Sequence, residues 1–199
     1  MELTRSGTTK AVAALLLLAA ISQPIYTALY ITAPEVDRQI LWGLEALMFV
    51  VLAALAGSAL AMAKRYTLAF SAIAFSAVLN VVQVGVGLVQ FGPAREASQA
   101  GGEIAVLAGA IFAFSFFAYY AAKVLLGLAA LVIGMGKMGE GSRALGGLTA
   151  LAGGVALAAN AILIMFGRDG FLPSPVAGAS GVVATLLLAI CLFSLNNDD

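Results

Sequence analysis

The chain has 199 residues, of which 62% are hydrophobic and 10% are charged, and its formal net charge is zero. A soluble domain carries roughly 25% charged residues, so this composition excludes a water-soluble globule, and the zero net charge gives no sign of a nucleic-acid partner. The length fits one domain, residues 1–199, and the lipid bilayer is the first partner that the composition implies.

Apolar runs of membrane-spanning length recur along the chain, separated by short segments rich in Gly, Pro or charged residues. Lipid offers no partners to backbone N–H and C=O groups, and the alternation typical of barrel strands is absent, so we expect helices. The sequence predicts an all-α polytopic membrane bundle with six transmembrane helices, at residues 11–31, 40–62, 67–91, 104–133, 143–166 and 176–195.

The first apolar run follows Arg5 and Lys10, as in a secretory signal peptide, but it lacks a convincing small-x-small cleavage site. We therefore expect a retained span. Charges between the spans predict the orientation: six Lys and Arg residues fall on the side of the termini and three on the other. This asymmetry places both termini in the cytoplasm, and the Ala- and Gly-rich spans with short loops fit a bacterial inner membrane.

Polar side chains interrupt the apolar spans at a similar depth. Counted at 1.5 Å per residue from the predicted cytoplasmic ends, most lie about 18–25 Å up, in the outer half of a hydrocarbon core about 30 Å thick. Lys123 lies about 15 Å up, and its side chain leans outward because helical side chains lean towards the helix N-terminus. The sequence therefore predicts a ligand-binding layer made of Gln23, Glu45, Asn80, Gln83, Lys123 and Asn160.

A charged group at mid-membrane costs at least about 2.5–3.5 kcal/mol on insertion scales, so Glu45 is expected to face the bundle interior with Lys123 as its partner. Three alternatives stay open. The polar residues could form a purely structural cluster, Glu45 could reach the hydrated interface, or Lys123 could extend to the cytoplasmic side.

Aromatic residues lie close to this layer. The segment from Phe112 to Tyr120 precedes Lys123, and these rings could either line a pocket or face lipid. Trp42, at the end of its span, is expected to be an interface anchor. Pro24 follows Gln23 and is expected to bend the first span.

Small residues at a spacing of four predict close helix contacts, within the chain or in a homo-oligomer. They form two stripes, Ala53/Gly57/Ala61 and Ala150/Gly154/Ala158. The six spans could also form two inverted halves that divide near Glu103, as in many transporters.

Enzymatic chemistry finds little support. The sequence has no histidine and a single cysteine, Cys191, which reads as a small buried hydrophobe. No hydrolase, metalloprotease or nucleotide-binding pattern is present, so no catalytic residue, metal ligand or cofactor is indicated. A membrane enzyme that uses Glu45 as its sole acid stays open as an alternative.

Six short spans in about 200 residues resemble, in length and span count, the substrate-binding subunits of energy-coupling vitamin transporters. Those subunits dock a partner through small residues on their first span, a pattern that Leu15 interrupts between Ala11 and Ala19 here. The favoured hypothesis is a protein that binds or transports a small solute at the polar layer. The alternative is a non-catalytic accessory subunit that docks on a larger membrane complex.

Overall fold

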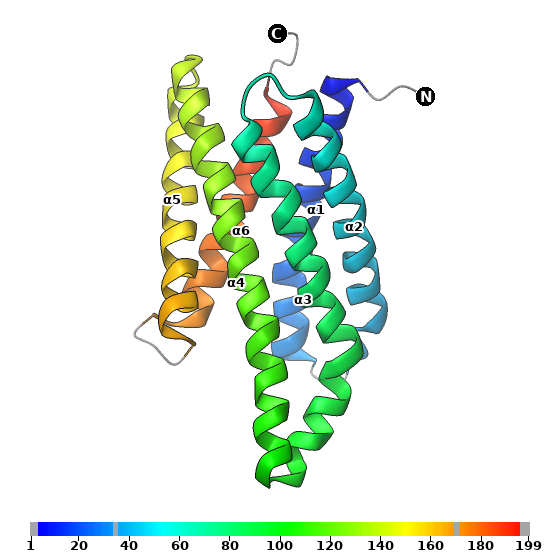
Figure 1. Cartoon of the computed structure of the whole chain (residues 1–199). Helices are drawn as coiled ribbons and strands as arrows, with labels where there is room; N and C mark the ends of the chain where they lie inside the picture. Colours follow the sequence, from blue (N-terminus) through cyan, green and yellow to red (C-terminus); the bar gives the residue numbers. More distant parts are fainter. Residues whose placement is uncertain (1–3, 34–35, 169–171, 196–199) are drawn as a thin grey trace.

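The computed structural model describes residues 4–33, 36–168 and 172–195, and every segment of regular structure among them is helical. The described residues form six helices (Figure 1): α1 Arg5–Thr32, α2 Gln39–Met62, α3 Thr67–Ala100, α4 Gly102–Gly139, α5 Arg143–Phe166 and α6 Ser174–Phe193. Each is long and apolar enough to cross a membrane. The predicted fold class is confirmed, and the chain is a multi-pass α-helical membrane protein. Its orientation in the membrane stays a prediction.

Helices that follow one another in the sequence pack side by side, from α1 through to α6, and α6 packs against α1 and α4 as well as α5. Figure 1 shows the start of α1 and the end of α6 at one end of the bundle, here called the termini end. At the other end, here called the hairpin end, α3 and α4 project beyond the remaining helices.

The long helices α3 and α4 correct two predicted breaks. Residues 92–103 were expected to form a loop, yet α3 continues through Pro93 to Ala100 and α4 begins at Gly102. The turn needs little more than Gly101 and Gly102, both with positive φ. At the termini end of α4 the glycine-rich stretch from Gly134 was also expected to be a turn, but the helix runs on to Gly139. At 1.5 Å per residue α3 and α4 are about 50–57 Å long, well above the thickness of the hydrocarbon core.

Close packing on α5 supports the helix there, and glycine lets the backbones of α4 and α5 touch. A Cβ at Gly127 would lie 2.8 Å from the carbonyl oxygen of Gly153, and one at Gly146 would lie 2.6 Å from that of Gly134. These glycines recur at a spacing of seven on both helices. Such close approach lets two helices pack by dispersion without large side chains.

Within the chain, the predicted small-residue stripes make only part of the expected helix contacts, and contacts in a homo-oligomer stay a prediction. Ala150 does lie in the α4–α5 contact, but a Cβ at Gly154 would meet nothing within 4 Å, and Ala158 is exposed. On α2 a Cβ at Gly57 would also meet nothing, and Ala61 is exposed. Spacing alone does not tell which of several small-residue faces a helix turns towards its neighbour.

Apolar side chains fill the half of the bundle nearer the termini end. Removing a CH₂ group from water stabilises a soluble protein by about 0.8 kcal/mol, but helices that associate in lipid gain no such free energy. Close packing therefore holds this half together. The fully buried large residues include Leu16, Phe49, Leu52, Ile73, Ile133 and Leu188. The half nearer the hairpin end is not filled in this way, and the predicted polar residues lie there.

Candidate functional site

Two adjacent residues of α1 connect the charged side chains of α2 and α4. The hydroxyl of Ser22 donates to Glu45 Oε1 at 3.0 Å, and Lys123 Nζ donates to Gln23 Oε1 at 2.8 Å. The direct ion pair of Glu45 with Lys123 is not formed within the described part of the chain. The two charges are nevertheless close enough to attract each other electrostatically.

Lys123 is fixed in the interior with few polar partners. Its side chain is 1% exposed and passes over Gly181, where a Cβ would lie 2.7 Å from Lys123 Cδ. Its ammonium lies 5.3 Å from the centre of the Tyr119 ring, a cation–π contact. An ammonium has three N–H donors, and among the described residues Gln23 accepts the only hydrogen bond from this one.

A cavity of about 300 Å³ lies on the hairpin side of this polar pair. Its polar lining includes Glu45, Gln23, Gln83 and Ser115, and Tyr119 also lines it. Lys123 itself is not in the lining; it lies behind Gln23 and Tyr119, which it contacts. The carboxylate, the amides and the hydroxyl therefore converge on one space from α1, α2, α3 and α4.

Aromatic rings form much of the remaining wall. Trp42 packs closely on Gly87: a Cβ added at Gly87 would lie 3.0 Å from the indole ring of Trp42. Its ring centre is 5.3 Å from that of Tyr26 and 5.7 Å from that of Phe91. Trp42, expected to be an interface anchor, is thus a half-buried residue of the cavity wall. Its position one turn before Glu45 on α2 was the sequence signal that it lies near the site. Hydropathy could not show whether its side chain faces the cavity or the lipid.

Asn80 and Asn160, also predicted for the site, do not line the cavity. Asn80 Nδ2 donates to the Ser76 carbonyl at 2.9 Å, within its own helix. Asn160 Nδ2 donates to the carbonyls of Ala156 and, on α6, Ala177. Both side chains are buried, and within the described chain their Oδ1 atoms have no hydrogen-bond partner. Asn160 thus links α5 to α6, and both residues lie beside the site.

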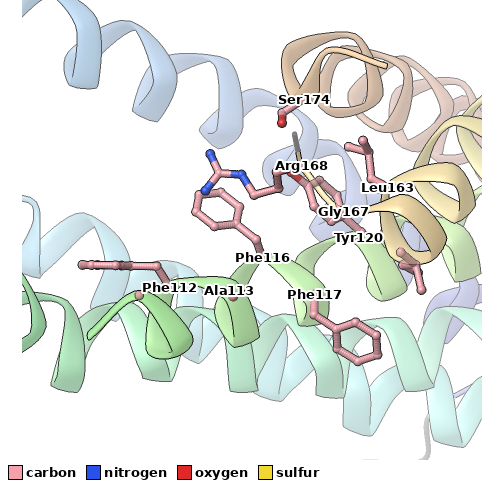
Figure 2. A pocket seen from close by; sticks show the side chains of 11 residues that line it. Phe112, Ala113, Phe116, Phe117, Tyr120, Leu163, Gly167, Arg168 and Ser174 are labelled. Carbon is pink, nitrogen blue, oxygen red and sulfur yellow. The ribbon is translucent and has the colours of Figure 1, made fainter. Parts of the chain in front are cut away.

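Two further hollows join the cavity towards the hairpin end. One, of about 520 Å³, shares Tyr26, Phe91 and Phe116 with the cavity and also borders Arg95 and Arg168. The other, of about 530 Å³, lies between α4 and the end of α5; it shares Phe116 and Tyr120 with the cavity, and Phe116 and Arg168 with the first hollow. Figure 2 shows the guanidinium of Arg168 over the Phe116 ring, 3.6 Å from its centre. Sequence reasoning had counted both arginines only as loop charges.

The chemistry available here is hydrogen bonding and charge. Within the described ranges, no group of three His, Cys, Asp or Glu side chains is placed to hold a metal ion. Cys191 is buried at the termini half, 3.2 Å from the Thr149 hydroxyl. The cavity can therefore orient a solute through amide, hydroxyl and carboxylate groups against aromatic walls.

A second polar cluster lies at the termini end. Glu140 accepts a hydrogen bond from the Tyr66 hydroxyl at 2.7 Å, and Lys137 reaches both Glu140 and the Ser194 carbonyl. The hydrogen bond from Tyr66 is the largest effect that lowers the pKa of Glu140. Burial, followed by contact with Glu140, raises the pKa of Tyr66 to about 12. This cluster joins the α2–α3 turn to the ends of α4 and α6.

Comparison with known proteins finds no matching family model, curated protein or solved structure. What the fold and the site define is a class: a multi-pass helical membrane protein, packed at the termini end and hollow towards the hairpin end, with charged and amide side chains at the floor of the hollow.

Proposed function

We propose that this membrane protein binds a small solute in the cavity above Gln23 and Glu45. The observation that carries the proposal is the convergence of Glu45, Gln23 and Gln83 on one space of about 300 Å³. That volume is at the lower end of the range of small-molecule sites, roughly 300–1,000 Å³. Such sites combine mostly apolar or aromatic walls with a few polar groups, which is the composition of this lining.

The cost of the polar floor favours a role in binding over one in packing. A charged group at mid-membrane costs at least about 2.5–3.5 kcal/mol on insertion scales. Lys123 gains one hydrogen bond and one ring contact in return. A bound solute can supply further acceptors through the cavity, directly or by displacing Gln23. A subunit that serves only to dock on a partner needs neither the cavity nor the charges.

The filled core at the termini half closes the inner end of the cavity, and this limits what the arrangement can do in transport. Leu16, Phe49 and Ile73 belong to the filled core at the termini half, and Lys123 lies between that core and the cavity. A solute that enters from the hairpin end would stop at Gln23 and Glu45. Transport would require the helices of the termini half to separate, so binding is the step that the arrangement supports most directly.

Native mass spectrometry of the full chain, released gently from its membrane, tests the proposal. The expected result is a stoichiometric small-molecule adduct that is lost in Glu45→Gln. Glu103→Gln is the matched control, because Glu103 is exposed at the start of α4 and lines none of the three hollows described above. A protein without any adduct, or an adduct unaffected by Glu45→Gln, would leave Glu45 as a structural carboxylate and favour the accessory-subunit alternative.

A further inference from the structure

The route into the cavity is lined by permanent positive charge. Arg95 on α3 and Arg168 after α5 both border the hollow of about 520 Å³ that joins the cavity at Tyr26, Phe91 and Phe116. No carboxylate lines this hollow among the described residues, which do not include Glu35 or Asp169. A guanidinium keeps its charge at any physiological pH, so this passage attracts anions and repels cations.

The two guanidinium groups remain available to a ligand. Arg168 lies against the Phe116 ring through its flat face, which holds the group in place and leaves the N–H edge accessible (Figure 2). Neither Arg95 nor Arg168 forms an ion pair with another described residue. The termini-end pair of Arg65 with Glu140 shows the contrasting case, a guanidinium 3.3 Å from a carboxylate.

Aromatic rings continue from the arginines to the cavity. The Phe112 and Phe91 rings meet edge to face with centres 5.0 Å apart, and Phe91 in turn meets Trp42. A flat or apolar body fits such a wall, whereas a small inorganic anion would leave most of it without contacts. At the inner end Glu45 disfavours a second negative charge on the same ligand.

Resting on the proposed function, we infer that the solute is an organic monoanion with an apolar body. Its carboxylate, or a similar planar oxyanion, is held by Arg95 and Arg168, because guanidinium donors match carboxylate geometry in pairs. Its body lies along Phe91, Phe112 and Phe116. Its inner end is uncharged or carries hydrogen-bond donors, and it faces Glu45 and Gln83.

Binding of defined probes to the detergent-solubilised full chain tests this inference. The probes are 2-naphthoate, its neutral isostere 2-naphthamide, decanoate and inorganic phosphate, each titrated by calorimetry. We expect 2-naphthoate to bind at least roughly tenfold more tightly than 2-naphthamide, since a hydrogen bond to a charged group contributes about 1.5–3 kcal/mol. Phosphate should not bind. Comparing decanoate with 2-naphthoate shows whether the natural ligand is a fatty acid or an aromatic acid, since both probes carry the same carboxylate.

Variants assign the anion site. Arg95→Gln and Arg168→Gln should each weaken 2-naphthoate binding roughly tenfold to a hundredfold. Arg143→Gln, an exposed arginine at the termini end, should leave it unchanged. Neither of the first two changes touches the filled core, and an unchanged unfolding temperature will confirm that each variant folds.

Three results would overturn the inference. Equal binding of naphthoate and naphthamide, both weakened by Glu45→Gln, would retain the cavity as a binding site and reject the anion. A mass-spectrometric adduct that survives in both Arg95→Gln and Arg168→Gln would likewise retain the cavity as a binding site and reject the anion. If no probe binds and no adduct is present, the proposed function fails together with the inference.

Discussion

Replacing Gly153 by alanine tests the close contact between α4 and α5. A Cβ at Gly153 would lie 2.5 Å from the backbone nitrogen of Leu131 and 2.6 Å from the carbonyl oxygen of Gly127. Neither backbone atom can move without shifting α4. Gly154, the next residue, offers a matched control because a Cβ there would meet nothing within 4 Å.

The expected magnitudes follow from two opposing effects. Alanine in place of glycine stabilises a helix by about 0.5–1 kcal/mol at either position. Overpacking a well-packed contact costs about 1–3 kcal/mol, and it applies only at Gly153. Gly153→Ala should therefore be less stable than Gly154→Ala by about 1–3 kcal/mol, while Gly154→Ala should equal or exceed the original chain.

Unfolding in mixed micelles at rising mole fractions of SDS, followed by circular dichroism, measures this difference. The free energies of unfolding of both variants are compared under the same detergent conditions. Equal stability of Gly153→Ala and Gly154→Ala would show that the backbones of α4 and α5 are not in contact at Gly153.

Further expectations concern the termini-end cluster and the space around Lys123. Since the pKa of Tyr66 is raised from 10.0 to about 12, the stability it contributes is complete below pH 10 and is lost as the pH rises to about 12. Tyr66→Phe should abolish that alkaline loss in unfolding measurements, and a profile identical to that of the original chain would contradict the Tyr66–Glu140 hydrogen bond. The pKa of Glu140 is lowered below 4.5, so its contribution is present above that pH and is lost as the pH falls through the lowered value. Glu140→Gln should flatten the acid limb of the profile, and an unchanged acid limb would place the cause elsewhere. Gly181→Ala places a Cβ 2.7 Å from Lys123 Cδ and should abolish the solute adduct, whereas Gly154→Ala, where a Cβ would meet nothing within 4 Å, should retain it. Loss of the adduct in both variants, or in neither, would count against the described path of the Lys123 side chain.

Much of the candidate site was accessible from the sequence, for a local reason. Polar residues inside apolar runs are costly, so their mere presence at a common depth marks an interior position. Gln23, Glu45 and Gln83 were chosen on that ground and they line one cavity. Whether that cavity binds a solute stays a prediction.

The same reasoning failed where direction around the helix axis decides the outcome. Asn80 lies less than one turn from Gln83 on α3, yet its side chain bonds within its own helix. Lys123 was expected to meet Glu45, but it bonds Gln23 instead, and Glu45 bonds Ser22. The depth of a residue in the membrane follows from its position in the sequence. The direction of its side chain turns by about 100° with each residue, and which direction faces the cavity depends on how the helix is rotated against its neighbours.

The sequence by itself determined the class of protein and the number of spans, because the need to bury apolar surface in lipid and to satisfy the backbone within each helix acts residue by residue. Tertiary structure alone decided three features. The glycines at 134 and 136 remain helical because α4 is supported by α5 at Gly134 and by the Tyr66 ring at Gly136. Trp42 lies in the cavity wall because Gly87 leaves room for its ring. Arg95 and Arg168, far apart in the chain, border one hollow because α3 continues past Pro93 to the level where α5 ends. Each depends on contacts between residues that are distant in sequence, which no local pattern encodes.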